Sequence, residues 1–281
     1  MEYLIELENA VSDFCVQKSY IYCICKKILY KINNESGIIV YQKEIFEKDG
    51  LARILISDGN RVFISDFCTL YILNEENFEI VVKMKLGEDL SSDICGMAVD
   101  DSKIYCSIRN GKIITVDKSS FVKNEYNISD ASMWSLKVYD NRLLCGTVNG
   151  QLLLLNRNTM SVEKKLILGK QNVRSLYVNG KILYAACQDK KLFKIDLSRF
   201  EVIETQKNAH KKMFDCLGLY DDMLVTASYP CSEIALWDMN TLEKRKEIKT
   251  TLSLSGNAFI EGNKLYITSR NIYGVGIIYL N

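Results

Sequence analysis

The sequence predicts an all-β protein, a seven-bladed β-propeller built from four-stranded antiparallel blades. Two columns of residues recur about every forty positions along the 281-residue chain, and the runs between turns are rich in Ile, Val, Leu and Tyr. Four short strands in a repeat of about forty residues are typical of one propeller blade. No segment keeps a helical periodicity beyond about two turns, which disfavours an α/β barrel.

The two columns set the number of repeats at seven. The first holds an apolar residue after a polar turn, at spacings of 41, 42, 39, 40, 41 and 41: Ile21, Val62, Ile104, Leu143, Leu183, Leu224 and Leu265. The second holds Asn or Asp at the end of the following strand, at spacings of 41, 43, 39, 40, 42 and 43: Asn33, Asn74, Asp117, Asn156, Asp196, Asp238 and Asn281. Because the columns advance in step, they support the same count independently.

One repeat shows the internal pattern of a blade. The segment 135–167, "SLKVYDNRLLCGTVNGQLLLLNRNTMSVEKKLI", contains four strand-like runs separated by polar turns. Its Asn149-Gly150 pair favours a tight hairpin, since both residues adopt positive φ at low cost. The alignment predicts a single domain over residues 1–281. Its blades are expected at 11–46, 51–87, 93–128, 132–169, 172–209, 213–250 and 254–281 plus 1–10.

The ends of the chain predict how the ring closes. The last repeat stops after its third strand, at "GIIYLN", while "MEYLIELENA" at the start resembles a fourth strand. We expect Tyr3 to Glu8 to complete the C-terminal blade, which removes exposed strand edges from the ring.

Composition excludes several classes of function. Lys plus Arg number 36 and Asp plus Glu 35, so no global charge favours nucleic acid, and no nucleic-acid partner is expected. No apolar run approaches the ~18 residues of a membrane span, and the acidic N-terminus does not resemble a signal peptide. We expect a cytoplasmic protein, monomeric alone or part of a complex.

Residues suited to catalysis or metal binding are sparse. The ten cysteines are scattered without a C-x-x-C pair, which is typical of free buried thiols, and there is one histidine. A Ser-His-Asp or Cys-His arrangement would require that histidine, His210. Glycine-rich phosphate loops are absent, so no cofactor and no metal site is expected.

One repeat resembles a WD repeat. Residues 209–250 contain His210 in the place of the usual Gly-His, "LVTAS" as second strand and "IALWD" as third. The resemblance implies a buried hydrogen-bond chain in which His210, Ser228 and Trp237 match three positions. The family's turn aspartate is missing, because the turn reads "YPCSE", so a partial chain is expected, with His210 as a packing element rather than a catalytic base.

The other six repeats are degenerate with respect to this motif. They contain no histidine, and the column of Trp237 holds apolar residues: Ile32, Leu73, Val116, Leu155, Ile195 and Leu280. The broad seven-bladed propeller class is therefore better supported than the strict WD-repeat family, and a quinoprotein-type propeller without cofactor stays open.

Geometry predicts a candidate binding site. The innermost strand of each blade starts at the mouth of the central channel, so equivalent positions form a ring. We call these positions the channel-mouth ring: Phe14, Arg53, Cys95, Trp134, Arg174, Asp215 and Asn257. Trp and Arg are enriched among the dominant contacts of interfaces. The alternative is that Trp134 is buried between blades and both arginines bind loop carbonyls.

Neighbouring residues extend this prediction. Four could form an apolar rim around the ring: Phe67, Met213, Phe214 and Tyr229. Charge on the same face is expected to be split, with acids near blade three (Glu88, Asp89 and Asp93) and bases near blades five and six (Lys170, Arg174, Lys190, Lys191, Lys211 and Lys212). Such a dipolar face would orient one partner, although solvated loops explain it equally well.

These features favour a non-enzymatic scaffold that binds a protein or peptide through the loop face around the channel. The alternative is a propeller enzyme with a small-molecule or metal site in the axial channel, where clustered loop carboxylates would act. Fold-level analogy carries most of this expectation, and fold does not determine function.

Overall fold

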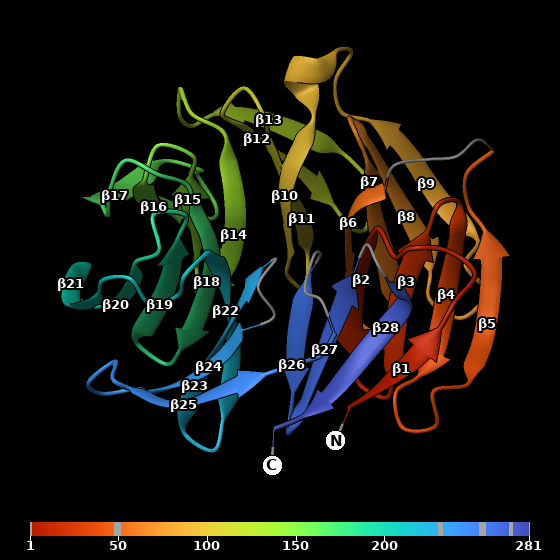
Figure 1. Ribbon diagram of the computed structural model, residues 1–281. Helices are drawn as coiled ribbons and strands as arrows, with labels where there is room; N and C mark the ends of the chain where they lie inside the picture. The colour runs from red at the N-terminus through yellow and green to blue at the C-terminus, as the bar shows by residue number, and fades with distance from the viewer. Residues whose placement is uncertain (1, 48–51, 230–232, 253–256, 270–271, 281) are drawn as a thin grey trace.

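The computed structural model describes residues 2–47, 52–229, 233–252, 257–269 and 272–280, which form seven four-stranded antiparallel sheets. The sheets stand around a common centre, with the first strand of most blades innermost and the fourth outermost (Figure 1). This confirms the predicted all-β, seven-bladed propeller. Among the described residues, the only helix is the three-residue 3-10 helix η1 (Leu90–Ser92), and no helix there is long enough to span a membrane.

The strands follow one another blade by blade. Blade 1 contains β2 (Asp13–Gln17), β3 (Tyr20–Cys25), β4 (Ile28–Asn33) and β5 (Ile39–Glu44). Blade 2 contains β6 (Ala52–Ser57), β7 (Arg61–Asp66), β8 (Thr69–Asn74) and β9 (Ile80–Lys85). Blade 3 contains β10 (Ile94–Val99), β11 (Lys103–Ile108), β12 (Lys112–Asp117) and β13 (Lys123–Asn127). Blade 4 contains β14 (Met133–Tyr139), β15 (Arg142–Thr147), β16 (Gln151–Asn156) and β17 (Val162–Ile167). Blade 5 contains β18 (Val173–Asn179), β19 (Ile182–Cys187), β20 (Leu192–Asp196) and β21 (Glu201–Gln206). Blade 6 contains β22 (Met213–Tyr220), β23 (Met223–Tyr229), β24 (Glu233–Asp238) and β25 (Lys244–Lys249). Blade 7 contains β26 (Ala258–Glu261), β27 (Lys264–Ser269), β28 (Ile272–Tyr279) and the N-terminal strand β1 (Glu2–Glu6).

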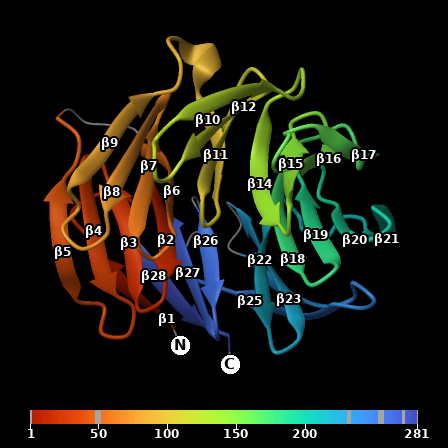
Figure 2. The same ribbon diagram turned by 180° about the vertical axis from the view of Figure 1, so that it is seen from behind.

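Ring closure joins the two ends of the chain. Strand β1 pairs antiparallel with β28 from Glu2 opposite Ile278 to Glu6 opposite Gly274. The two termini therefore lie near each other, and β1 lies beside β28 in both views (Figures 1 and 2). The predicted closure by the N-terminal strand is confirmed.

The Asn/Asp column has a local cause in the hairpin between the third and fourth strands. The side-chain oxygen of Asp117 accepts hydrogen bonds from the backbone N–H groups of Ser119 (2.9 Å) and Ser120 (2.8 Å). Short Asx side chains make this turn readily. The same bonds to the residues two and three positions later occur at Asn33, Asn74, Asn156, Asp196 and Asp238. In blades 1 to 6 the column is therefore a turn requirement repeated once per blade, and Asn281 of blade 7 lies outside the described residues.

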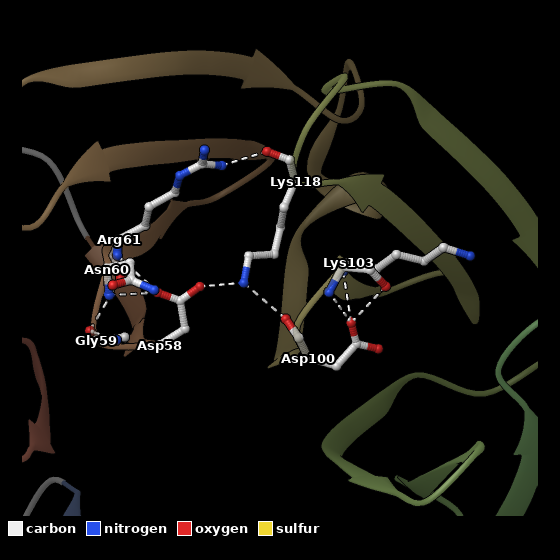
Figure 3. A network of polar contacts seen from close by, with 9 residues as sticks. Asp58, Gly59, Asn60, Arg61, Asp100, Lys103 and Lys118 are labelled. Carbon is white, nitrogen blue, oxygen red and sulfur yellow. Dashed lines mark hydrogen bonds and ion pairs between the residues drawn. The ribbon is translucent and has the colours of Figure 1, made fainter.

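Polar contacts also join neighbouring blades on the side of these hairpins (Figure 3). Lys118, which follows Asp117, reaches from blade 3 into blade 2 and forms an ion pair with Asp58. Its Nζ donates to the carbonyl of Asp100 (3.0 Å), and Arg61 donates to the carbonyl of Lys118 (2.5 Å). These partly buried bonds fix blades 2 and 3 relative to each other.

The apolar core lies between the blades. The second and third strands are buried on both faces, which explains runs such as "YIYCIC" in β3. Outer strands such as β5 and β25 are mostly exposed. Loops at the start of the inner strands are thereby held on a rigid frame, and these loops carry the candidate site.

Candidate functional site

The predicted ring residues lie at or next to the beginnings of the innermost strands, and four of them share one backbone feature. In β6, β10, β14 and β18 the pairing to the next strand shifts register across a single extra residue. Those extra residues are Arg53, Cys95, Trp134 and Arg174. A β-bulge re-aims a side chain away from the regular alternation of the sheet. The bulges therefore explain why these positions depart from the apolar pattern.

The position of Phe14 differs from the predicted ring, because its side chain is buried rather than exposed at the channel mouth. Strand β2 pairs with β3 without a bulge, with Phe14 opposite Cys23, so its side chain keeps the regular alternation. It is 5% exposed and packs with Val16 in the core cluster of blades 1 and 7. Its contribution is to packing between blades.

Two arginines and one buried aspartate form the most concentrated charge at the mouth. Arg53 Nη1 lies 3.1 Å and Arg109 Nη2 2.9 Å from the same oxygen, Oδ2 of Asp93. The carboxylate is buried, whereas both guanidinium groups are well exposed to solvent. We call Arg53, Asp93 and Arg109 the arginine cluster, and its formal charge is +1.

The arginine cluster is held by a strained turn. Phe67, between β7 and β8, has a φ of 48°, which is costly for a bulky residue. Its carbonyl accepts a hydrogen bond from Ile94 N (3.0 Å), and its ring lies under the guanidinium of Arg53, 4.5 Å from centroid to Cζ. Cation–π contact thus orients Arg53 at the mouth.

Trp134 lies next along the ring. It is 45% exposed, so the alternative that it is buried between blades is wrong. Its carbonyl packs on Gly96, where an added Cβ would approach it to 3.2 Å, and the hydroxyl of Ser132 donates to the carbonyl of Arg109 (2.5 Å). The exposed indole therefore belongs to the same sector as the arginine cluster.

The rest of the ring is engaged in contacts within the protein. Arg174 donates through Nε (3.2 Å) and Nη2 (3.3 Å) to the two carboxylate oxygens of Asp215, which joins blades 5 and 6. Asn257 is exposed but donates its side-chain amide to Asp13. Asp13 is buried and also accepts from Leu55 N (2.6 Å), so it joins blades 1, 2 and 7. Burial raises the pKa of Asp13 to about 7, against three hydrogen bonds that favour its ionised form.

The predicted rim needs one correction. Phe214 is fully buried, with its ring 4.8 Å from that of His210, so it belongs to the core of blade 6. Phe67 and Met213 are partly exposed. The side chain of Tyr229 lies outside the described residues.

The WD-like hydrogen-bond chain exists in blade 6 but runs through a different hydroxyl. The Oγ1 of Thr226, not that of Ser228, lies 2.7 Å from Nε2 of His210 and accepts from Nε1 of Trp237 at 2.7 Å. Trp237 is paired with Leu224, so Thr226 is two residues away and Ser228 four, about 13 Å along the strand. An indole cannot span that distance.

Glu233 supplies the carboxylate that the turn sequence was predicted to lack. Its Oε2 lies 3.4 Å from Nδ1 of His210, and its Oε1 lies 3.3 Å from Nζ of Lys244. Burial lowers the pKa of His210 to about 4, so the ring is neutral at pH 7. The carboxylate favours the proton on Nδ1, which leaves Nε2 to accept from the hydroxyl of Thr226. The Trp237–Thr226–His210 links are hydrogen bonds, whereas the His210–Glu233 contact at 3.4 Å is too poorly aligned to be one; together these contacts assign His210 a structural role.

The described residues show little sign of metal or thiol chemistry. Among them, no group of three His, Cys, Asp or Glu side chains is placed to hold a metal ion. The eight cysteines whose side chains the structure describes are free thiols. Burial raises the pKa of Cys95 despite the nearby charges of Arg109 and Arg53, so its thiol is protonated at pH 7.

Some of the charged loop residues that were expected to divide the loop face into an acidic and a basic part are neutralised by partners within the protein, and others are not. Glu88 pairs with Lys85 (2.5 Å), Asp89 accepts from its own loop, and Lys191 pairs with Asp189 (2.5 Å). Four exposed lysines have no carboxylate partner in the described part: Lys170, Lys190, Lys211 and Lys212. These four lysines near blades 5 and 6 are therefore solvated and available to a partner.

Sequence reasoning missed Arg109, Thr226 and Glu233. The hairpin register of β10 and β11 places Ile94 opposite Ile108, which brings Arg109 beside Asp93. The alternation of β23 places Thr226 nearer to Trp237 than Ser228 is. Glu233 stands at the end of the turn "YPCSE", and it could have been recognised by accepting a glutamate in the place of the family's aspartate.

Comparison with known proteins shows the fold alone. No protein-family model and no curated protein sequence matches this chain. The chain is similar to the β-propeller domain of Cps50 (Swd1) from Myceliophteria thermophila, with a TM-score of 0.81, 9% identity and 100% of both chains covered. It is similar to U3-55K, with a TM-score of 0.81, 13% identity and coverage of 99% of this chain and 98% of that one. It is also similar to BamB from Moraxella catarrhalis, with a TM-score of 0.71, 13% identity and coverage of 96% and 85%.

Fold and internal contacts together define the class. The chain is a seven-bladed β-propeller with a WD-repeat-like fold, and one of its blades carries the buried hydrogen-bond chain of His210, Thr226 and Trp237.

Proposed function

We propose that this propeller is a non-enzymatic scaffold that binds a protein or peptide partner through the loop face, centred on Trp134 and the arginine cluster. The carrying observation is the exposure of Trp134, 45%, on a bulge of a rigid inner strand. An exposed indole leaves apolar surface in contact with water, and a partner that covers this surface would gain the free energy of burying it.

Two further observations support this centre. Trp and Arg dominate interface energetics, and here they share one sector of the mouth. Arg174, the other arginine of the predicted ring, is occupied by Asp215 through two hydrogen bonds. The arginine cluster is therefore the better candidate for the polar part of the contact.

Affinity capture with matched variants tests the proposal. The immobilised full chain is exposed to an extract of its native cells, and bound proteins are identified by mass spectrometry. Trp134→Ala is expected to lose the captured partner. Ile167→Ala, which removes an even more exposed apolar side chain from the outer strand β17 of the same blade, is expected to retain it. Capture that survives Trp134→Ala, with folding checked by circular dichroism, contradicts the proposed site.

A further inference from the structure

We infer that the arginine cluster recognises a carboxylate of the partner, an Asp or Glu side chain next to a large apolar residue that packs on Trp134. This inference rests on the proposed function and specifies the chemistry of the same site.

The first step is the supply of unused donors. Each guanidinium carries five N–H groups, and Arg53 and Arg109 each direct one hydrogen bond to Asp93. The two donating nitrogens bind the same oxygen, so they lie no more than about 6 Å apart. No other protein acceptor meets either guanidinium in the described part of the chain. Two adjacent, half-exposed forks match the spacing of a carboxylate.

The second step is charge. Two arginines and one buried aspartate leave a formal charge of +1 in a partly desolvated place. One carboxylate neutralises it, whereas a phosphate of charge near −2 would leave the site negative. Nearby acids do not compete, since Glu88 is paired with Lys85 and Asp89 is capped by Ser91 and Ser92.

The third step is preorganisation. Phe67 keeps an unfavourable backbone conformation that places its ring under Arg53, and the backbone bond from Ile94 holds Phe67 beside Asp93. Oδ1 of Asp93 is buried and has no hydrogen-bond partner within the described residues. Because that oxygen is buried, a partner can reach only the two exposed guanidinium groups, and their fixed placement lowers the free-energy cost of ordering them when a carboxylate binds.

Peptide selection on the full chain tests the inference. A phage library of random twelve-residue peptides is selected on the immobilised protein, and the recovered sequences are synthesised with a fluorescent label. The expected peptides carry Asp or Glu within two residues of Leu, Phe, Tyr, Trp or Met. Replacing that acid by its amide should weaken binding about 10- to 100-fold, the range for hydrogen bonds to charged groups. The phosphoserine version should bind no more tightly than the carboxylate peptide.

Variants of the protein complete the test. Arg53→Gln with Asp93→Asn and Arg109→Gln removes the charge without leaving a buried carboxylate unpaired, and should weaken binding by the same factor. Arg109→Lys alone, a milder change, should weaken it several-fold because the forked geometry is lost. Lys211→Gln with Lys212→Gln removes two charges elsewhere on the loop face and should have less than a twofold effect.

The outcomes separate this inference from the proposed function. Peptides that require Trp134 but carry no acid, or whose acid is indifferent to the arginine variants, overturn the inference and leave the proposed function intact. Tighter binding of the phosphoserine version overturns the choice of carboxylate. Failure to select any peptide overturns a short acidic motif as the ligand. Selected peptides whose affinity is unchanged by replacing Trp134 and by replacing the arginines contradict the proposed function as well.

Discussion

Replacing Thr226 by Val should destabilise the protein more than any other loss of one buried hydroxyl in blade 6. The hydroxyl is the common partner of Trp237 Nε1 and His210 Nε2, both at 2.7 Å, and all three side chains are buried. Val keeps the shape but leaves two buried polar groups unpaired, at about 1–3 kcal/mol each. The expected loss is therefore about 2–6 kcal/mol, which lowers the Tm by about 3–10 °C in a chain of this size.

Ser228 supplies a matched control on the same strand. Its hydroxyl is fully buried and has no hydrogen-bond partner within the described residues, so Ser228→Ala should change stability by less than about 0.5 kcal/mol. Thr226→Ser should recover most of the loss, because it restores the hydroxyl. Denaturant unfolding followed by tryptophan emission measures all three variants. Equal effects of Thr226→Val and Ser228→Ala would refute the assignment of the chain to Thr226.

Three further predictions follow from the fold. Folding raises the pKa of Asp13 from its ordinary value of 3.8 to about 7, so the folded protein holds this proton more tightly than the unfolded chain does. The stability gained from protonated Asp13 is therefore complete below about pH 3.8 and is lost as the pH rises through 7. The change is roughly 4 kcal/mol at 1.36 kcal/mol per pKa unit, and urea unfolding of Asp13→Asn between pH 5 and 8 should show a weaker decline than the wild type. Deleting residues 1–6 should expose the edge of β28 and produce dimers or aggregates in size-exclusion chromatography. Lys118→Met should lose about 1–3 kcal/mol of unfolding free energy, since it leaves Asp58 of blade 2 without its inter-blade ion pair and the carbonyl of Asp100, within blade 3, without its donor.

Controls for these predictions come from the same chain. The contribution of His210 opposes that of Asp13 below pH 6.5 and cancels when wild type and Asp13→Asn are compared at each pH. A constant difference between them across the range would contradict the assigned pKa. A monomeric, equally stable deletion variant would show that β1 does not close the ring. Lys165→Met, at an exposed position of β17, should be neutral, and a similar effect at Lys118 would contradict an inter-blade role.

The sequence predicts the architecture because each blade repeats a local requirement. The Asn/Asp column recurs since each hairpin needs a short side chain that accepts two backbone hydrogen bonds, as at Asp117. The apolar column recurs since the second strand of every blade is buried on both faces. Both signals are local in the chain, so they survive even where the WD-like motif is lost.

The site is predicted less completely because it depends on register and on contacts between blades. Equivalent positions on the inner strands identified Arg53, Cys95, Trp134 and Arg174, but the bulges that re-aim them leave no distinct sequence pattern. Phe14 was misplaced for the same reason, since its strand lacks the bulge. The pairing of Arg109 with Asp93 depends on the hairpin register of β10 and β11.

The emission of Trp134 tests the central claim most directly. The chain has two tryptophans, and Trp237 is 1% exposed, so a ligand at the mouth changes the emission of Trp134 alone. Titration with the selected acidic peptide should give a saturable blue shift that disappears in Trp134→Phe and weakens about 10-fold or more in the variant that replaces Arg53, Asp93 and Arg109. Saturable binding of the peptide or of the captured partner without any change in the emission of Trp134 would contradict a binding site at the channel mouth.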